Sequence, residues 1–404
     1  MRRSTLLAFL LCAATAAQVV GQTKDEALGK ISEIEEQLQE LRIIVEAIDD
    51  DPAPDPDPTP DPAPDPEPDP DAPSTKGIWM SREEIAALPL NAYWDNVRDY
   101  ADRSASPDVS DHSEVANAIV MAKALVYART GDEEYRRQVI RLLGHEREGG
   151  VIGTEDNSAD RTLGPARKIC AYVIAADLVD LPADADADFR DWIGTVRHRN
   201  LSGKTLISTH EGRPNNWGTS ASATRLAIAL YLEEDDEVER VAEVFKGWLG
   251  DRNSYAGFKY NEEEKWQFNP DRPVGINPKG ATKHIDGAER NIDGVLPDDL
   301  RRAGKVRWPP PKENYVYGAL QGVVATAIML ERAGYDDVWE WEDRAIMRAF
   351  VWMHDVADFH AEDSGGDDTH MLPVIKSKYG IDYWDEEPTE HGKIVSFTDW
   401  MFGR

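Results

Sequence analysis

A succession of helical segments joined by short turns constrains this chain more than any other feature. From residue 76 onward, apolar side chains recur at roughly the spacing of one helix turn. They do so over segments 114–129, 133–143, 163–181, 219–232, 238–249, 317–333 and 339–356. Short turns rich in Gly and Asp join these segments in pairs, and strand-like alternation is scarce. Serial helix pairs without a fixed repeat period predict an all-α fold, an (α/α) toroid over residues 76–404, whose inner helices line a central cleft.

The first 75 residues have a different composition, and three segments are expected there. Residues 1–22 carry Arg2 and Arg3 ahead of a short apolar run, which is typical of a secretory signal peptide. Residues 23–50 place Ile, Leu and Val in heptad positions, which predicts a coiled coil that favours trimers; the alternative is a lone amphipathic helix. Residues 51–75 repeat Pro with Asp or Glu and predict an extended polyproline linker. We therefore expect a secreted homo-oligomer, extracellular or periplasmic, or carried on a virion.

Charge and cysteine content exclude several classes of protein. The chain carries a net charge of −31, of which residues 1–75, with 5 Lys and Arg against 17 Asp and Glu, contribute −12. An acidic body argues against nucleic acid as a partner, because its binders need basic faces. No segment after the signal peptide is apolar enough to span a membrane. Cys170 alone remains beyond residue 22, so no intrachain disulfide is expected.

Residues 250–312 interrupt the helical pattern with a long stretch rich in Gly, Pro, Asn, aromatic and charged residues. Irregular segments of this length are usually functional when they occur in a compact domain; the alternative is a solvated loop. The second half is basic within an acidic protein, and it includes His284, Arg301 and Arg302. Cations beside aromatic rings suit an anionic polysaccharide that carries carboxylates.

Such uronic-acid polymers are broken by β-elimination, which sets demands on the residues of a site. A base removes the proton at C5, next to the carboxylate, and an acid protonates the departing O4. Because C5–H is a weak acid, the charge of the carboxylate must be neutralised by donors such as Asn and Arg. The stretch RPNNWGTSASATRLAIALY at 213–231 offers Arg213, Asn215 and Asn216 ahead of an apolar helix. These asparagines are either helix caps or donors directed into the cleft.

Three motifs resemble the alginate lyase family of polysaccharide lyases: the double Asn, DGVLPDDLRR at 293–302 and ENYVYGALQG at 313–322. The resemblance implies an (α/α) toroid and β-elimination on a uronate polymer without a cofactor or metal. By the same resemblance Asn216 neutralises the carboxylate, Arg302 assists it, and Tyr315 is the catalytic tyrosine. Substrate contacts are expected from a wider set of residues around these motifs: Arg213, Asn215, Trp217, His210, Arg301, Tyr317 and Arg167.

The chain departs from this family at one position. Members carry a catalytic His directly after the double Asn, whereas Trp217 stands there. The base is then expected from His284 in the basic stretch, with His210 second, or Tyr315 serves as both base and acid.

Two other functions remain open from the sequence. Asp298 and Asp299 could form the carboxylate pair of a glycoside hydrolase on the same toroid. A coiled coil on a stalk equally fits a non-catalytic carbohydrate-binding protein or a virion appendage. Saturated products would identify the hydrolase, and binding without cleavage would identify the binding protein.

Overall fold

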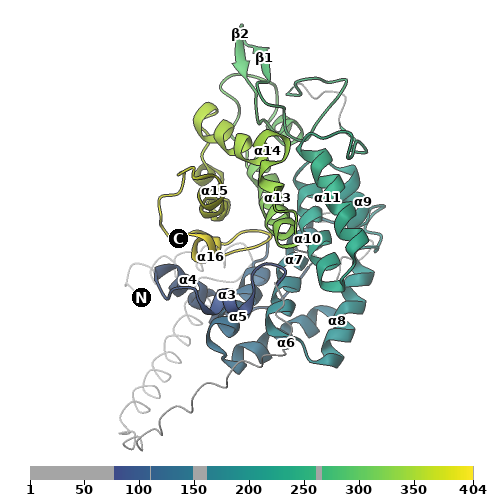
Figure 1. Ribbon diagram of the computed structural model, residues 1–404, viewed down its shortest axis with the longest axis vertical. Helices are drawn as coiled ribbons and strands as arrows, with labels where there is room; N and C mark the ends of the chain where they lie inside the picture. The colour runs from purple at the N-terminus through teal and green to yellow at the C-terminus, as the bar shows by residue number, and fades with distance from the viewer. Residues whose placement is uncertain (1–76, 110, 149–161, 261–265, 404) are drawn as a thin grey trace, which may run out of the picture. The chain divides into compact units, whose positions relative to one another are not determined.

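The computed structural model describes residues 77–403 except 110, 149–161 and 261–265. The predicted signal peptide, coiled coil and linker therefore lie outside the described residues. Within the described part the chain is mostly helical and forms the predicted all-α toroid of helix pairs (Figure 1). None of its helices there is both long and apolar enough to span a membrane.

Four helices form the inner layer, and their side chains are buried almost all round. They are α5 (Ala116–Thr130), α7 (Leu163–Val179), α10 (Asn216–Leu232) and α13 (Tyr315–Arg332). A helix that is apolar or small on every face is stable only where neighbours cover it on all sides. In the sequence these segments are the ones rich in Ala, Val, Ile and Leu, which explains their central position.

The four inner helices run parallel, so their N-termini gather at one end of the toroid. Lys168 near the start of α7 donates to the side chain of Asn117 at the start of α5, over 3.2 Å. Farther along, Thr326 of α13 donates to Ser222 of α10, over 3.1 Å. Polar side chains at these N-termini are thereby brought close together, although they are far apart in the sequence.

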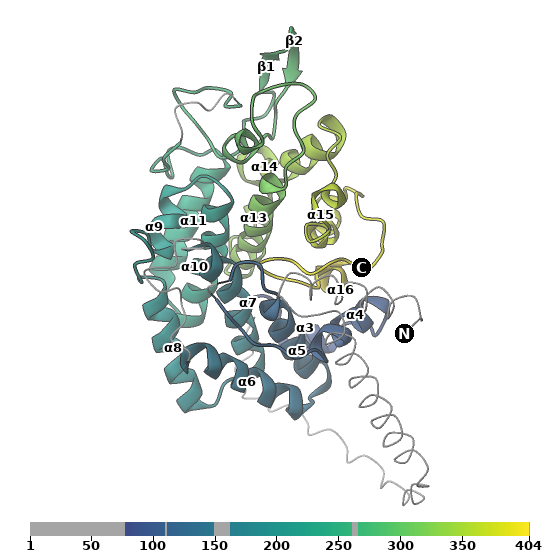
Figure 2. The same ribbon diagram turned by 180° about the vertical axis from the view of Figure 1, so that it is seen from behind.

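The outer layer consists of amphipathic helices that alternate with the inner ones along the chain (Figure 2). The main members are α4 (Ala92–Ala101), α6 (Glu133–Glu148), α8 (Ala183–Val196), α11 (Asp235–Leu249) and α14 (Trp341–Val351). Helix α6 packs on both α5 and α7, and α11 packs on α10 and α14. Each outer helix buries one apolar face, such as Val241, Phe245 and Trp248 of α11, and exposes charged residues on the other.

Helices α10 and α13 approach closely because glycine lies at their crossing. A Cβ added to Gly322 would lie 2.3 Å from the carbonyl carbon of Thr219, well inside contact distance. Gly318, one turn earlier, has Asn216 as its neighbour. The absence of a side chain at Gly322 allows the N-terminal part of α13 to lie against that of α10, whereas a Cβ at Gly318 would meet Asn216 at an ordinary contact distance of 3.8 Å.

The C-terminal segment links the last inner helix to the first. The backbone N–H of Lys393 donates to Oε1 of Gln321 in α13, over 2.7 Å. The carbonyl of Lys393 accepts from Nδ2 of Asn117 in α5, over 3.1 Å. Smaller elements pack around this end: α3 (Arg82–Ala86), α15 (Leu372–Tyr379) and α16 (Thr398–Phe402), with 3₁₀ turns at 338–340, 361–364 and 369–371 and a π-helical turn at 352–356.

The stretch 250–312 contains more regular structure than the sequence analysis expected. A hairpin pairs β1 (Thr282–Ile285) with β2 (Ala288–Asn291). Its turn, Asp286-Gly287, has φ of 48° and 81°, the two positive values that a two-residue hairpin turn of type I′ requires. A short helix, α12 (Pro297–Leu300), and a 3₁₀ turn at 301–303 follow. The Asp-Gly dipeptide was the sequence signal for this hairpin.

Candidate active site

The double asparagine begins α10, and its first member is a helix cap. The Oδ1 of Asn215 accepts the backbone N–H of Trp217 over 3.2 Å, which satisfies one free amide of the first turn. The Nδ2 of Asn215 donates to Oδ2 of Asp298 over 2.7 Å. Both ends of this amide are therefore used within the protein, and Asn215 holds the start of α10 to α12. It was predicted as a substrate contact, and its geometry instead favours the cap.

Helix α12 places two buried carboxylates against the double asparagine, and Asp299 is the one that binds Asn216. The Oδ1 of Asp299 accepts the backbone N–H of Asn216 over 3.0 Å, and Oδ1 of Asp298 accepts Nε of Arg301 over 2.8 Å. Asp298 and Asp299 are 2% and 1% exposed. Burial, and then the charge of Asp298, raise the pKa of Asp299 well above its ordinary value. Their burial and partners favour a positioning role for both carboxylates over an acid–base pair of a glycoside hydrolase.

Asn216, Arg302 and Tyr315 form a cluster at the N-termini of α10 and α13, called here the Asn-Arg-Tyr cluster. The Nη1 of Arg302 donates to Oδ1 of Asn216 over 3.0 Å. The guanidinium carbon of Arg302 lies 3.7 Å from the centroid of the Tyr315 ring. Three residues that the motifs singled out, from positions up to 99 apart, are thus in contact.

Two of the three members of the cluster are accessible to solvent. Asn216 is 3% exposed, whereas Tyr315 is half-buried and Arg302 is exposed. Because Oδ1 of Asn216 is occupied by Arg302, its Nδ2 remains a donor, and no hydrogen bond within the described residues uses it. An amide donor and a guanidinium beside a phenol can bind a carboxylate and transfer a proton next to it.

His284 lies apart from this cluster. It is exposed on β1, where it pairs with Glu289 across the hairpin. Over the described residues it makes no hydrogen bond, ion pair or ring contact with Asn216, Arg302 or Tyr315. The structure therefore brings together three of the four residues predicted as catalytic.

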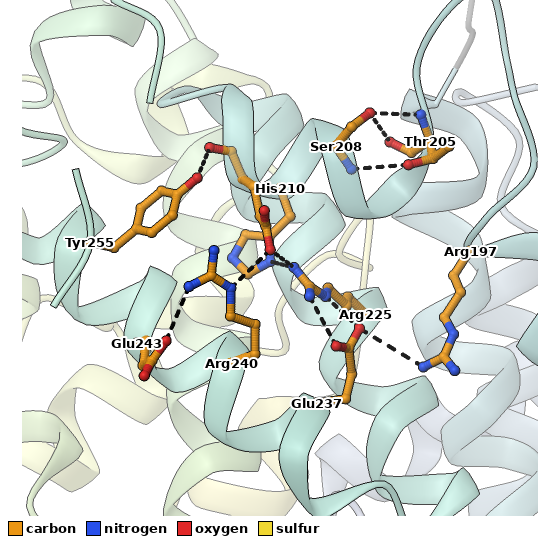
Figure 3. Close-up of polar contacts among 10 residues, drawn as sticks. Arg197, Thr205, Ser208, His210, Arg225, Glu237, Arg240, Glu243 and Tyr255 are labelled. Atoms are coloured by element: carbon orange, nitrogen blue, oxygen red, sulfur yellow. Dashed lines mark hydrogen bonds and ion pairs between the residues drawn. The ribbon is translucent and has the colours of Figure 1, made fainter. Parts of the chain in front are cut away.

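His210, the second candidate for the base, belongs to a buried ionic network on the outer side of α10 (Figure 3). It lies on α9 (Leu206–Gly212) and is 3% exposed. Its Nδ1 lies 3.3 Å from Nη1 of Arg225, which also binds Glu211 and Glu237. Burial, and then the charge of Arg225, lower the pKa of His210 well below its ordinary value. This environment keeps the imidazole neutral, and His210 is an acceptor for Arg225.

The remaining predicted contacts separate into three locations. Arg213 stacks on Trp217, with its guanidinium carbon 4.5 Å from the ring centroid, and both are partly exposed just before and within the first turn of α10. Arg301 binds Asp298, as described above. Arg167 is 9% exposed and lines a separate cavity at the start of α7. Of these, Arg213 and Trp217 lie in the sequence nearest to the Asn-Arg-Tyr cluster.

The prediction that Tyr317 contacts substrate is wrong. Its side chain is 0% exposed, and its hydroxyl donates to the carbonyl of Phe359 over 2.5 Å. It packs edge-on against the ring of Phe359. Residues two positions apart on a helix point in different directions, so Tyr317 faces the core where Tyr315 faces the cluster.

Comparison with known proteins gives one result. The model of the alginate lyase family matches residues 63–267, just over half of the chain. The match includes the double asparagine and α10 and ends before Arg302 and Tyr315. No curated protein matches the chain.

Proposed function

The chain belongs to the alginate lyase family, and on this premise we propose that it cleaves a uronic-acid-containing, alginate-like polysaccharide by β-elimination. The family makes the chain a polysaccharide lyase. The polymer and the roles of the residues are our proposal. Its main support is the contact of Asn216, Arg302 and Tyr315 at one open position.

In this mechanism two donors neutralise the carboxylate of the sugar that loses its C5 proton. Nδ2 of Asn216 and the exposed guanidinium of Arg302 each donate to a carboxylate oxygen. Donors fixed in advance stabilise the charge that develops as the C5–H bond breaks, which makes the proton acidic enough to remove. The carboxylates of Asp298 and Asp299 hold α12 against α10 and thereby fix the spacing of these donors.

We assign proton transfer to Tyr315, as base and then as acid, because His284 makes no contact with the cluster. The phenolate oxygen of Tyr315 takes the C5 proton and becomes a neutral phenol, the C4–O4 bond breaks, and a C4=C5 double bond forms. The same oxygen then returns the proton to the departing O4, so atoms and charge balance. The Arg302 cation over the ring stabilises the negative charge that the phenolate oxygen carries before it takes the C5 proton and again after it has returned the proton.

The unsaturated product provides the test. Purified protein incubated with uronate polymers of several linkage types should release oligosaccharides whose new double bond absorbs in the ultraviolet. Neutral polysaccharides of similar length serve as controls and should give no absorbance. Depolymerisation to saturated sugars, or binding without depolymerisation on every uronate polymer, would contradict the proposal.

We also propose that the enzyme is exported and trimeric, on the evidence of sequence segments 1–22 and 24–49. A polyproline linker at 51–75 would then separate the catalytic domains and raise the effective concentration of sites on a long polymer. Deletion of 23–75 should give a monomer with unchanged turnover on short oligosaccharides and weaker action on long polymer. A full-length protein that sediments as a monomer at micromolar concentration would contradict this.

A further inference from the structure

A buried carboxyl group lies next to the Asn-Arg-Tyr cluster and is only partly satisfied. Asp299 of α12 is 1% exposed, and its Oδ1 accepts the backbone N–H of Asn216 over 3.0 Å. Its Oδ2 is also buried, and no described residue forms a hydrogen bond with it. A buried polar atom without a partner is rare in a folded protein and requires a physical explanation.

The neighbouring residue, Asp298, shows what an ionised carboxylate receives in the same surroundings. Its Oδ1 accepts Nε of Arg301 over 2.8 Å, and its Oδ2 accepts Nδ2 of Asn215 over 2.7 Å. Asp299 instead receives one neutral donor and, over the described part of the chain, forms no ion pair. Burial without a partner favours the neutral form of a carboxyl group, and a like charge beside it does so further. Asp298 therefore carries the negative charge of this pair, and Oδ2 of Asp299 carries the proton.

The charges that act on Asp299 agree with this assignment. Burial is the largest influence on the pKa of Asp299 and raises it, and the charge of Asp298 raises it further. The N–H of Asn216 and the charges of Arg302 and Arg301 lower this pKa by smaller amounts, so the net shift is well upward. The carboxyl group of Asp299 therefore keeps its proton at pH values at which an exposed Asp is ionised.

The helices packed against α12 present neutral groups to this carboxyl group, as far as the described residues show. Helix α10 presents the amide of Asn216. The first turn of α13 carries two titratable groups, Tyr315 and Tyr317. The hydroxyl of Tyr317 donates to the carbonyl of Phe359, and the ring of Tyr315 lies against Arg302.

The proton on Asp299 determines the net charge beside the cluster. Arg302 forms no ion pair with any described residue, and its guanidinium donates to Asn216 and lies over the ring of Tyr315. With Asp299 neutral, the full positive charge of Arg302 acts on the carboxylate of the sugar and on the phenolate of Tyr315. An ionised Asp299 would offset part of this charge and would repel both anions.

We propose that Asp299 keeps its carboxyl proton in the working enzyme and thereby leaves the charge of Arg302 uncompensated for the carboxylate of the substrate. This inference rests on the proposed function. Asp299 is a positioning residue that acts through Arg302 and Asn216, because its own side chain is buried. A purely structural role, in which Asp299 holds α12 to α10, would be filled equally well by the ionised form.

Infrared spectroscopy detects the proton directly and does not depend on catalysis. At neutral pH the spectrum of the parent minus that of Asp299→Asn should contain the C=O stretching band of a protonated carboxyl group. Asp343→Asn is the matched control, because Asp343 lies on the surface in an ion pair with Lys279. Its difference spectrum should contain the bands of an ionised carboxylate. If Asp299→Asn does not fold, Asp299→Thr replaces it, since a hydroxyl can also accept the N–H of Asn216.

Binding measurements test what the proton does. In a Tyr315→Phe background at low ionic strength, titration calorimetry compares a uronate trisaccharide with its form reduced to alcohols, at a series of pH values. As the pH rises and the infrared band disappears, affinity for the uronate form should fall about tenfold, the effect of one like charge at roughly 10 Å in protein. With Asp299→Asn added, this affinity should stay within about twofold, and so should the affinity of both proteins for the reduced form.

The outcomes separate this inference from the proposed reaction. An ionised Asp299 at neutral pH would overturn the inference even if the enzyme is an active lyase, and so would an unchanged uronate affinity while the band disappears. A band that persists at every pH at which the protein is folded, with equal uronate affinities for the two proteins, would support it. A protein that forms no unsaturated product yet shows the band and the pH-dependent affinity would refute the reaction alone.

Discussion

Two arginines beside α10 have opposite environments: Arg225 belongs to the helix, and Arg302 belongs to the 3₁₀ turn at 301–303 against its N-terminus. Arg225 is 2% exposed, and its guanidinium donates to Glu237 over 2.7 and 3.0 Å and to Glu211 over 3.0 Å. Arg302 comes from the loop against the start of α10 and is exposed. Within the described part of the chain Arg302 donates one hydrogen bond, to Asn216, and stacks on Tyr315.

This difference separates a structural from a functional use of the same side chain. Arg225 is buried and donates to Glu211 and Glu237, and its ion pairs together with that of Arg240 tie α9, α10 and α11 together (Figure 3). Around Arg302 the pairing is incomplete, and an amide donor of Asn216 is unused within the described residues. Incomplete pairing at an accessible position is what a site for an anion requires.

Breaking the ionic network around Arg225 should produce the largest effect of these variants, and that effect should be a loss of stability. Arg225→Ala leaves Glu237 without its main cation, removes one of the two arginines bound to Glu211, and should lower the free energy of unfolding by about 3–5 kcal/mol. Chemical denaturation measures this. Arg344→Ala is the control, because among the described residues Arg344 pairs only with Glu340, in an exposed position, and its loss should cost far less stability. Equal costs for the two variants would contradict the structural role of the network.

Removing Arg302 should instead reduce the activity of the enzyme. Arg302→Ala should lower kcat/KM on uronate polymer about 10²–10³-fold, the usual effect of losing one donor to a developing negative charge. Its unfolding free energy should stay within about 1 kcal/mol of the parent, because Arg302 is exposed. Initial rates of ultraviolet absorbance and denaturation curves on the same samples give both quantities. An Arg302→Ala protein that loses stability but keeps its activity would show that Arg302 has a structural role instead of a functional one.

Asp299 should make the stability of the α10–α12 contact depend on pH. Burial raises the pKa of the Asp299 carboxyl group in the folded state, so the folded protein binds the carboxyl proton more tightly than the unfolded chain does. The contribution of this proton to the free energy of unfolding is fully present below the ordinary Asp pKa of about 3.9. It is lost as the pH rises through the pKa of Asp299 in the folded protein. Asp299→Asn removes the titrating carboxyl group. The free energy of unfolding of this variant should therefore fall less than that of the parent as the pH rises above about 3.9. Unfolding measured in steps of pH checks this, and parallel curves for the two proteins would exclude the effect.

Loss of the histidine on the hairpin should have the smallest effect. His284→Ala should keep turnover within about threefold of the parent, whereas loss of a true general base costs about 10²–10⁴-fold. His284 is exposed, so folding should be unaffected. A loss of 10²-fold or more would return the base to His284 and limit Tyr315 to the role of acid.

Most of the helical fold could be predicted from periodicity, because the inner helices are long and rich in small or apolar residues. The predicted segments correspond to α5, α6, α7, α10, α11, α13 and α14. Three starts were placed late, at 219 for α10, 238 for α11 and 317 for α13. In α10 and α11 the first turn carries polar residues such as Asn216 and Asp235, which hide the apolar pattern. The link made by Lys393 could not be predicted, because it depends on contacts to Asn117 and Gln321 with no local sequence signal.

Only some of the residues of the candidate site could be placed from the sequence. The motifs identified Asn216, Arg302 and Tyr315, whose contact depends on the glycine-mediated approach of α10 and α13. Tyr317 was misplaced because it shares the motif with Tyr315, although it points to the core. The structural role of Asp298 and Asp299 became apparent only when α12 was seen against α10. The hairpin had a signal in Asp286-Gly287, and the sequence analysis missed it.

The most direct test of the account is the rate of unsaturated product formation by Tyr315→Phe. The substitution removes one hydroxyl and little packing from a half-buried ring. Turnover on uronate polymer should fall about 10²-fold or more, while the unfolding midpoint and the affinity for uronate oligosaccharide stay near those of the parent. Parental turnover in a folded Tyr315→Phe protein would contradict the central claim, because the Asn-Arg-Tyr cluster would then not be the catalytic site.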